Sequence, residues 1–107
     1  MMILEDYVAH MNNGDYEGVA NLFTETCSFD DGGARTIQVD DLVVKGRVNL
    51  KATFQSVFEA YKVRAEIVKL NANTMEYDVY LGETKLECIG CATLKEGKIA
   101  EYIVRPR

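Results

Sequence analysis

Apolar side chains recur along this chain with two periods, one typical of helices and one typical of strands. Residues 3–11 carry a single helical stripe of apolar side chains: Ile3, Leu4, Tyr7, Val8 and Met11. Gly14 suits a left-handed helix end, and Asp15 suits the cap of a second helix. The buried side of that helix is predicted to consist of Tyr16, Val19, Ala20 and Phe23. The chain is therefore expected to begin with two short helices.

Strand-like stretches then surround a third helix. Residues 27–29 are predicted to begin a short strand, and residues 36–45 to form another, with a polar interruption at Asp40 and Asp41. Beyond Gly46, a third amphipathic helix is predicted from its apolar positions: Leu50, Phe54, Val57, Phe58 and Tyr61. After this helix the period falls to two, and four strands are predicted over residues 63–71, 74–81, 84–95 and 98–105.

This order of elements predicts an α+β fold in one domain spanning residues 1–107. Consecutive strands joined by short turns pair antiparallel. A curved, mostly antiparallel sheet with three helices on its concave face would form a cone with one open end. Such a cone has room for one core and one pocket.

Composition narrows the classes of partner. The net charge is −5, and the 12 Lys and Arg residues are scattered singly, so nucleic acid is not expected as a partner. No apolar run approaches the roughly 20 residues that span a bilayer, and the N-terminus does not resemble a signal peptide. Three cysteines do not suit a disulfide framework. We expect a cytoplasmic protein with reduced thiols that does not bind membranes.

The stretch Phe29–Gly33, which reads FDDGG, holds the main candidate for chemistry. Strand parity places Cys27, Phe29 and Asp31 on one face and Asp30 on the other. Because Phe29 is expected in the core, Asp31 should follow it inward, to the open rim where a carboxylate can be tolerated. The alternative is structural, an Asx-type turn from Asp31 onto the two glycines.

Two N-terminal segments carry a family resemblance. Tyr7–Asp15, followed by Val19–Phe23, resembles the opening of nuclear transport factor 2-like proteins, which include ketosteroid isomerases and SnoaL-like cyclases. The resemblance extends over nearly the whole chain and implies a cystatin-like cone in the order ααββαββββ. The superfamily hosts isomerases, dehydratases, cyclases, hydrolases and proteins without catalysis, so the fold alone does not settle function.

Similarity to ketosteroid isomerase implies roles for two residues. Tyr7 has the position of the tyrosine that donates to the developing oxyanion. Asp31 follows Phe23 by eight residues, as the general base does. The implied activity is proton transfer next to a carbonyl in a small apolar or carbonyl-bearing molecule, with no cofactor and no metal. The alternatives are a non-catalytic ligand-binding or dimerisation module of the same fold, and a protein–protein adaptor.

The chain departs from the isomerase pattern in two places. The family's second oxyanion donor is a protonated aspartate on a late strand. The corresponding window here, Cys88–Cys91, contains no carboxylate, and Glu87 is the nearest acid. Phe54 stands where the family tends to place a supporting tyrosine. The oxyanion site is therefore expected to differ from that of the isomerase.

Further expectations concern the pocket wall and the outer surface. The pocket is expected to be lined by Phe29, Phe54, Val57, Phe58, Met75 and Cys91. The outer face of the last strands is expected to pair two subunits into a homodimer, with four residues in reach: Tyr77, Tyr80, Tyr102 and Ile103.

Other conspicuous residues have simpler interpretations. His10 is expected to pair with Asp6 on an exposed helix flank. Cys88 and Cys91 have CxxC spacing, but in mid-strand their thiols point to opposite faces, which does not suit metal or redox chemistry. Three basic residues are expected to form a solvated rim, or alternatively to favour an anionic ligand: Arg35, Lys45 and Arg47.

Overall fold

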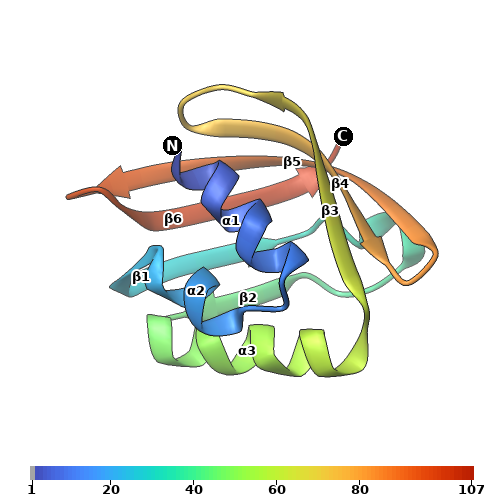
Figure 1. Cartoon of the computed structure of the whole chain (residues 1–107), viewed down its shortest axis with the longest axis horizontal. Helices are drawn as coiled ribbons and strands as arrows, with labels where there is room; N and C mark the ends of the chain where they lie inside the picture. The colour runs from blue at the N-terminus through green and yellow to red at the C-terminus, as the bar shows by residue number, and fades with distance from the viewer. Residues whose placement is uncertain (1) are drawn as a thin grey trace.

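The computed structural model describes residues 2–107, and its elements follow the predicted order (Figure 1). They are α1 (Ile3–Asn12), α2 (Tyr16–Asn21), β1 (Phe23–Asp31), the 3₁₀ turn η1 (Arg35–Ile37), β2 (Leu42–Lys45), α3 (Arg47–Ala60), β3 (Val63–Leu70), β4 (Thr74–Leu81), β5 (Thr84–Lys95) and β6 (Lys98–Pro106). Gly14 adopts a φ of 64°, and the Asp15 side chain accepts from the Gly18 amide at 2.9 Å, as expected for the turn between the first helices. Within these residues, no helix combines the length and the apolar character of a membrane span.

Two boundaries differ from the predicted ones. Phe23 opens β1 instead of closing α2, because the Ile99 amide donates to the Leu22 carbonyl at 2.8 Å and draws this segment beside β6. The strand predicted over residues 36–45 exists only from Leu42 onward. Before it, the Arg35 guanidinium donates to both carboxylate oxygens of Asp41, at 2.9 and 2.6 Å, and closes the segment into a loop.

The six strands form one mixed, mostly antiparallel sheet in the order β2-β1-β6-β5-β4-β3. β1 and β6 are parallel, and every other neighbouring pair is antiparallel. Figure 1 shows α1 crossing one face of the sheet and α3 running beside β1 and β2. After α3, the chain enters the sheet at the opposite edge and returns strand by strand, so β6 ends beside β1 in the centre.

The core lies between this sheet face and the three helices. The fully or nearly buried helix residues are Leu4, Tyr7, Val8, Met11, Val19, Ala20, Leu50 and Phe54. Aromatic rings meet edge-on in the middle: the Tyr7 ring lies 5.1 Å from that of Tyr102 and 6.2 Å from that of Phe54. Such edge-to-face pairs add specific geometry to the burial of apolar area.

The expectation that Tyr77 and Tyr102 lie on the outer face is wrong. Their exposed fractions are 1% and 0%, and both rings belong to the core. In the register of the sheet, Tyr102 lies beside Phe29 on one side and Ala92 on the other, and both of these residues are buried. The outer face keeps Tyr80 and Ile103, which are partly exposed. Pairing of two subunits through this face stays a prediction.

A side-chain amide fastens α1 to the sheet edge. Asn12 accepts from the Ala65 amide at 2.7 Å and donates to the Ala65 carbonyl at 3.0 Å, so it pairs with β3 as a neighbouring strand would. These bonds satisfy backbone groups at an edge strand. They also fix the end of the helix that carries Tyr7.

Gly90 leaves space for a tyrosine on the neighbouring strand. A Cβ added at Gly90 would lie 2.1 Å from the Tyr102 hydroxyl oxygen and 2.6 Å from the adjoining ring carbon. The irregularity between β5 and β6 lies elsewhere, between Thr93 and Leu94, so Gly90 does not mark a bulge. The reason for glycine at position 90 is therefore the close approach of a ring.

We predict that Gly90→Ala lowers the free energy of unfolding by about 1–3 kcal/mol, because the added methyl overpacks a closed core. Chemical denaturation of the purified variant measures this loss. Tyr102→Phe removes the nearest clashing atom, so the Gly90→Ala/Tyr102→Phe double variant should lose less than the sum of the single variants. Strict additivity of the two losses would contradict the assigned contact.

Candidate functional site

The open end of the fold leads into a pocket of about 350 Å³. This is within the size range of small-molecule sites, roughly 300–1,000 Å³. The wall is mostly apolar and comes from α1, α3, the inner face of the sheet and the loop between β1 and β2. Four residues predicted to line the pocket are on this wall: Phe29, Phe54, Val57 and Phe58.

Two other residues expected on the wall lie elsewhere. Met75 has an exposed fraction of 0% and belongs to the core. Cys91 is exposed, because β5 alternates and turns Cys88 and Ala92 inward. The predicted opposite orientation of Cys88 and Cys91 is thus confirmed, but Cys88 is the one that lines the pocket.

Asp31 and Tyr7, from β1 and α1, both line this pocket. Asp31 follows Phe29 inward by strand alternation. Asp30 faces the other way, where both its carboxylate oxygens accept from the Arg105 guanidinium at 3.1 Å. The structure therefore brings the two sequence-predicted groups to one cavity.

The Asp31 carboxylate also forms the Asx-type turn that the sequence offered as its alternative, structural role. The Gly33 amide donates to Asp31 Oδ1 at 2.8 Å, while Oδ2 takes no part in this turn. The pKa of Asp31 is raised overall, mainly because the carboxylate is buried. The nearby charges of Asp41 and Asp30 also raise this pKa, whereas the Gly33 hydrogen bond and Arg105 lower it. A carboxylate with a raised pKa is a stronger base than an exposed one.

Two more tyrosines lie at the site, and the sequence pattern did not predict them there. Tyr77 lines the pocket, and the Tyr102 hydroxyl donates to the Tyr77 hydroxyl at 3.2 Å. Burial raises the pKa values of Tyr7, Tyr77 and Tyr102, and the charge of Asp31 raises them further. All three hydroxyls therefore keep their protons at neutral pH. In the sequence, Gly90 could have indicated such a buried ring, because its lack of a side chain makes room for Tyr102.

Cys88 contributes a neutral thiol to the wall. Burial, helped by the charge of Asp31, raises the pKa of Cys88 to about 12. The thiolate is the reactive form of cysteine, and its population is very small at neutral pH. Among residues 2–107, no group of three or more His, Cys, Asp and Glu side chains is arranged to hold a metal ion.

The remaining candidates lie away from the pocket wall. His10 Nδ1 is 3.1 Å from the Asp15 carboxylate, so its predicted pairing with Asp6 is wrong. The three basic residues that were expected at the rim each have a partner in the chain: Arg35 binds Asp41, Lys45 binds the Ser28 hydroxyl, and Arg47 binds the Phe23 carbonyl. No Lys, Arg or His of the described chain lines the pocket, whereas Asp31 and Asp40 do.

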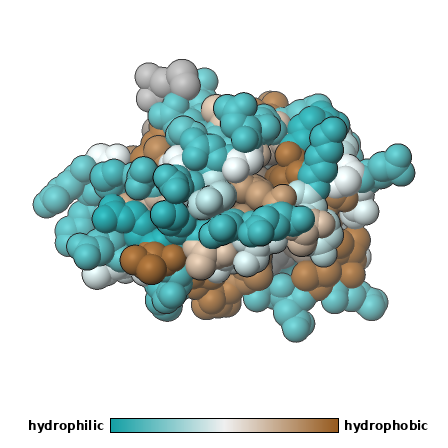
Figure 2. Space-filling view, turned by 60° about the horizontal axis from the view of Figure 1, so that its bottom comes forward, coloured by the Kyte–Doolittle hydropathy of each residue, from teal (hydrophilic) through white to brown (hydrophobic). Residues whose placement is uncertain are grey.

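The mouth of the pocket has an apolar rim. Four residues that line it keep exposed fractions between 41% and 51%: Ile37, Val39, Leu42 and Tyr61. Hydrophobic residues also gather on the lower part of the face shown in Figure 2. An apolar rim and a wall without cations suit an uncharged ligand better than an anion.

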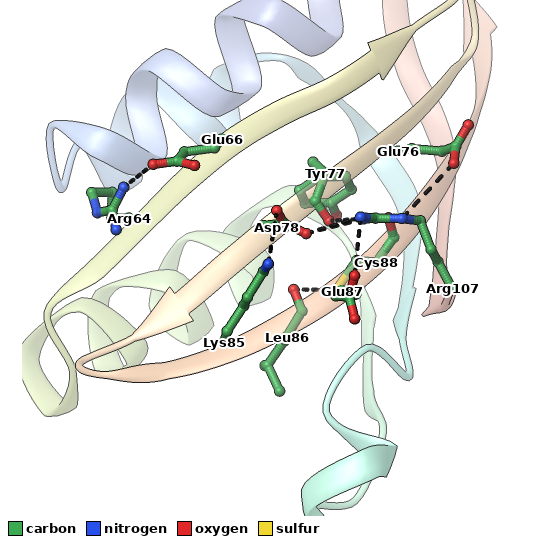
Figure 3. Close-up of polar contacts among 10 residues, drawn as sticks. All are labelled: Arg64, Glu66, Glu76, Tyr77, Asp78, Lys85, Leu86, Glu87, Cys88 and Arg107. Carbon is green, nitrogen blue, oxygen red and sulfur yellow. Dashed lines mark hydrogen bonds and ion pairs between the residues drawn. The ribbon is translucent and has the colours of Figure 1, made fainter.

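Arg107 clamps the strands that form the sheet side of the pocket (Figure 3). Its guanidinium donates to the carbonyls of Tyr77 and Cys88, at 3.0 and 3.3 Å, and to the Asp78 carboxylate at 3.1 Å. The Asp78 side chain is only 10% exposed, and Lys85 lies 3.7 Å from it. The charges on the outer face thus hold the backbone behind two pocket residues.

The sequence profile of the SnoaL-like domain matches residues 4–102. The chain belongs to the SnoaL-like domain family. No curated protein matches this SnoaL-like chain significantly. Because members of one fold perform different chemistry, family membership leaves the reaction open.

Solved structures similar to this SnoaL-like domain cover nearly all of it. A "putative ketosteroid isomerase" from Kribbella flavida DSM 17836 has a TM-score of 0.76 and 13% identity, over 98% of this chain and 75% of its own. A cystatin fold protein from Novosphingobium aromaticivorans has a TM-score of 0.76 and 15% identity, over 97% of both chains. The epoxide hydrolase/cyclase-like enzyme SalBIII, described in pyran ring formation in salinomycin, has a TM-score of 0.72 and 22% identity, over 98% of this chain and 88% of its own. At these identities the likeness shows the fold.

We predict that Arg107→Ala lowers the free energy of unfolding by about 2 kcal/mol, because it leaves the largely buried Asp78 carboxylate with Lys85 as its remaining cationic partner. Denaturant unfolding measures the loss. Arg64→Ala is the matched control: Arg64 pairs with Glu66, both side chains are about half exposed, and the loss should be below about 1 kcal/mol. Equal losses would contradict the clamp.

We also predict that Asp31→Asn stabilises the fold at neutral pH. The folded-state pKa of Asp31 is raised above its ordinary value of 3.8, so the folded protein binds this proton more tightly than the unfolded chain does. Its contribution to stability is therefore most favourable below pH 3.8 and falls as pH rises through the folded pKa. Asparagine has no charge to bury and keeps an oxygen for Gly33.

Thermal unfolding of wild type and Asp31→Asn across pH 4–7 measures this effect. The expected difference in melting temperature is on the order of a few degrees. The melting temperature of Asp31→Asn should exceed that of wild type at pH 7, and the difference should shrink towards pH 4. Asp30→Asn, which neutralises the outward-facing neighbour, should show no such gain. A constant difference over this range would contradict the raised pKa.

Proposed function

We propose that this SnoaL-like domain is a cofactor-independent enzyme that moves a proton next to a carbonyl in a small, uncharged, largely apolar molecule. The supporting observation is that Asp31, a carboxylate with a raised pKa, and the neutral hydroxyl of Tyr7 line the same pocket. A general base together with a hydrogen-bond donor is what enolisation of a carbonyl compound requires.

In the proposed reaction, Asp31 takes a proton from the carbon beside the carbonyl. The electron pair of the broken C–H bond forms the enolate, whose charge collects on the carbonyl oxygen, and Tyr7 donates a hydrogen bond to it. Protonated Asp31 then returns the proton to the same carbon or to a conjugated one. Return to the same carbon is exchange, and return to a conjugated carbon is isomerisation, so no oxidant or reductant is needed.

Both groups gain from the apolar wall. A positioned base contributes roughly 10²–10⁴ in rate, and an oxyanion donor about 10²–10³. Burial keeps the pKa of Tyr7 well above its usual value, so this hydroxyl donates without being deprotonated by Asp31. The wall without cations favours a neutral ketone or enone over a carboxylate.

One observation favours a second candidate, a non-catalytic ligand-binding module. The bond from the Gly33 amide to Asp31 gives the carboxylate a structural role in the turn. In that case the same apolar ligands would bind, but no proton would move.

Proton exchange in D₂O separates these candidates. We expect the wild-type protein to exchange the α-protons of 2-tetralone or 3-cyclohexenone for deuterium, which NMR measures. Asp31→Asn should catalyse this exchange about 10²–10⁴-fold more slowly. The rate should rise with pH as Asp31 loses its proton, with a midpoint above its ordinary pKa of 3.8.

Asp30→Asn is the matched control, because it removes a charge from the adjacent residue on the other face of β1 and should leave the rate unchanged. Equal exchange by wild type and Asp31→Asn would overturn the role of Asp31. Binding of 2-tetralone with no exchange by the wild type would support the non-catalytic module.

A further inference from the structure

We infer that Tyr77 is a second hydrogen-bond donor to the substrate oxygen, and that Tyr102 behind it is the residue that positions its hydroxyl. This inference rests on the proposed proton transfer at Asp31 and extends it to two residues on the sheet. It accounts for how an oxyanion is held where the expected carboxylic acid is missing.

Tyr77 reaches the pocket from a different side than Tyr7 and Asp31. It comes from β4, whereas Tyr7 comes from α1 and Asp31 from β1. With an exposed fraction of 1%, the Tyr77 ring is held by packing, and its backbone carbonyl is held by Arg107 on the outer face (Figure 3). A donor held in this way needs little reorganisation when charge develops.

The hydrogen-bond arrangement directs the proton of Tyr77. Tyr102 is fully buried and is not part of the pocket wall, and its hydroxyl donates to the Tyr77 oxygen at 3.2 Å. A hydroxyl carries one proton and can also accept, so a Tyr77 hydroxyl that accepts from Tyr102 has its own proton available for an acceptor in the pocket.

A ligand oxyanion is a better acceptor than a neutral tyrosine, and hydrogen bonds to charged groups are the stronger kind. When an enolate forms beside Tyr7, the Tyr77 proton can turn to the substrate oxygen, because both residues line the same pocket. The bond from Tyr102 then polarises Tyr77 and strengthens its donation. Burial keeps the pKa of Tyr77 well above its usual value, so the proton stays available.

The register of the sheet explains why a tyrosine on β4 can act here. Tyr77 pairs directly with Cys88 on β5, the first residue of the window that lacks a carboxylate. Gly90, two residues further along β5, leaves the space that brings the Tyr102 hydroxyl to Tyr77. A polar donor thus reaches the pocket from the neighbouring strand.

Binding of 4-nitrophenol tests the donor role without catalysis, because its phenolate resembles an enolate and absorbs differently from the neutral phenol. In an Asp31→Asn background, where the repelling carboxylate is absent, the pocket should bind the phenolate. Adding Tyr77→Phe should weaken phenolate binding about 10- to 100-fold, the range expected for one hydrogen bond to a charged group. Adding Tyr102→Phe should weaken it less, by about 3- to 10-fold.

4-Nitroanisole, which cannot ionise, is the matched ligand and should bind equally to all these variants. Tyr80→Phe is the matched protein control, because Tyr80 lies on β4 outside the pocket wall, with its ring under Arg64. Tyr80→Phe should change neither the phenolate affinity nor the 4-nitroanisole affinity. The ratio of phenolate to anisole affinity therefore reports on hydrogen bonding and not on packing.

Unchanged phenolate binding after Tyr77→Phe, with a loss after Tyr7→Phe, would overturn the role of Tyr77 and leave the proposed function standing. Failure of every variant, including the Asp31→Asn parent, to bind the phenolate would also overturn the inference. Equal weakening of both ligands by Tyr77→Phe would show a rearranged wall and would overturn it as well. The exchange assay on Asp31→Asn, made separately, decides the proposed function itself.

Discussion

Phe29 anchors β1 in the aromatic core, and the position of the pocket carboxylate depends on that anchor. Its ring lies 5.4 Å from that of Phe54 and 6.1 Å from those of Phe23 and Tyr102. Full burial of such a side chain contributes roughly 2–3 kcal/mol. Because strand side chains alternate, burying Phe29 carries Asp31 into the pocket. A register slip of one residue would present Asp30 instead, and the ion pair between Asp30 and Arg105 opposes that slip.

The apolar surroundings then set the chemistry of the groups that they enclose. Burial makes the Asp31 carboxylate more basic and keeps the three tyrosines protonated, so one environment holds a basic carboxylate together with neutral hydroxyls. The same burial makes the charged carboxylate unfavourable for folding.

Charge is divided between the two faces of the sheet. In the pocket, the polar groups are neutral hydroxyls, a neutral thiol and the carboxylates of Asp31 and Asp40. On the outer face, Arg107 joins Glu76, Asp78 and Glu87 into a charged network behind the pocket residues (Figure 3). This separation keeps cations away from the cavity while still using them to hold its backbone.

The sequence by itself determined the order of the elements, the turn at Gly14 and Asp15, and the inward direction of Asp31. These features depend on local periodicity and backbone preference, which neighbouring residues already specify. Only the tertiary structure decided that Tyr77 and Tyr102 turn inward and that Cys91 turns outward. Alternation along a strand defines two faces but does not say which is buried when both carry apolar or aromatic residues. That choice is made by pairing with strands far away in the chain, where Phe29 and Ala92 flank Tyr102 and Gly90 leaves space for its hydroxyl.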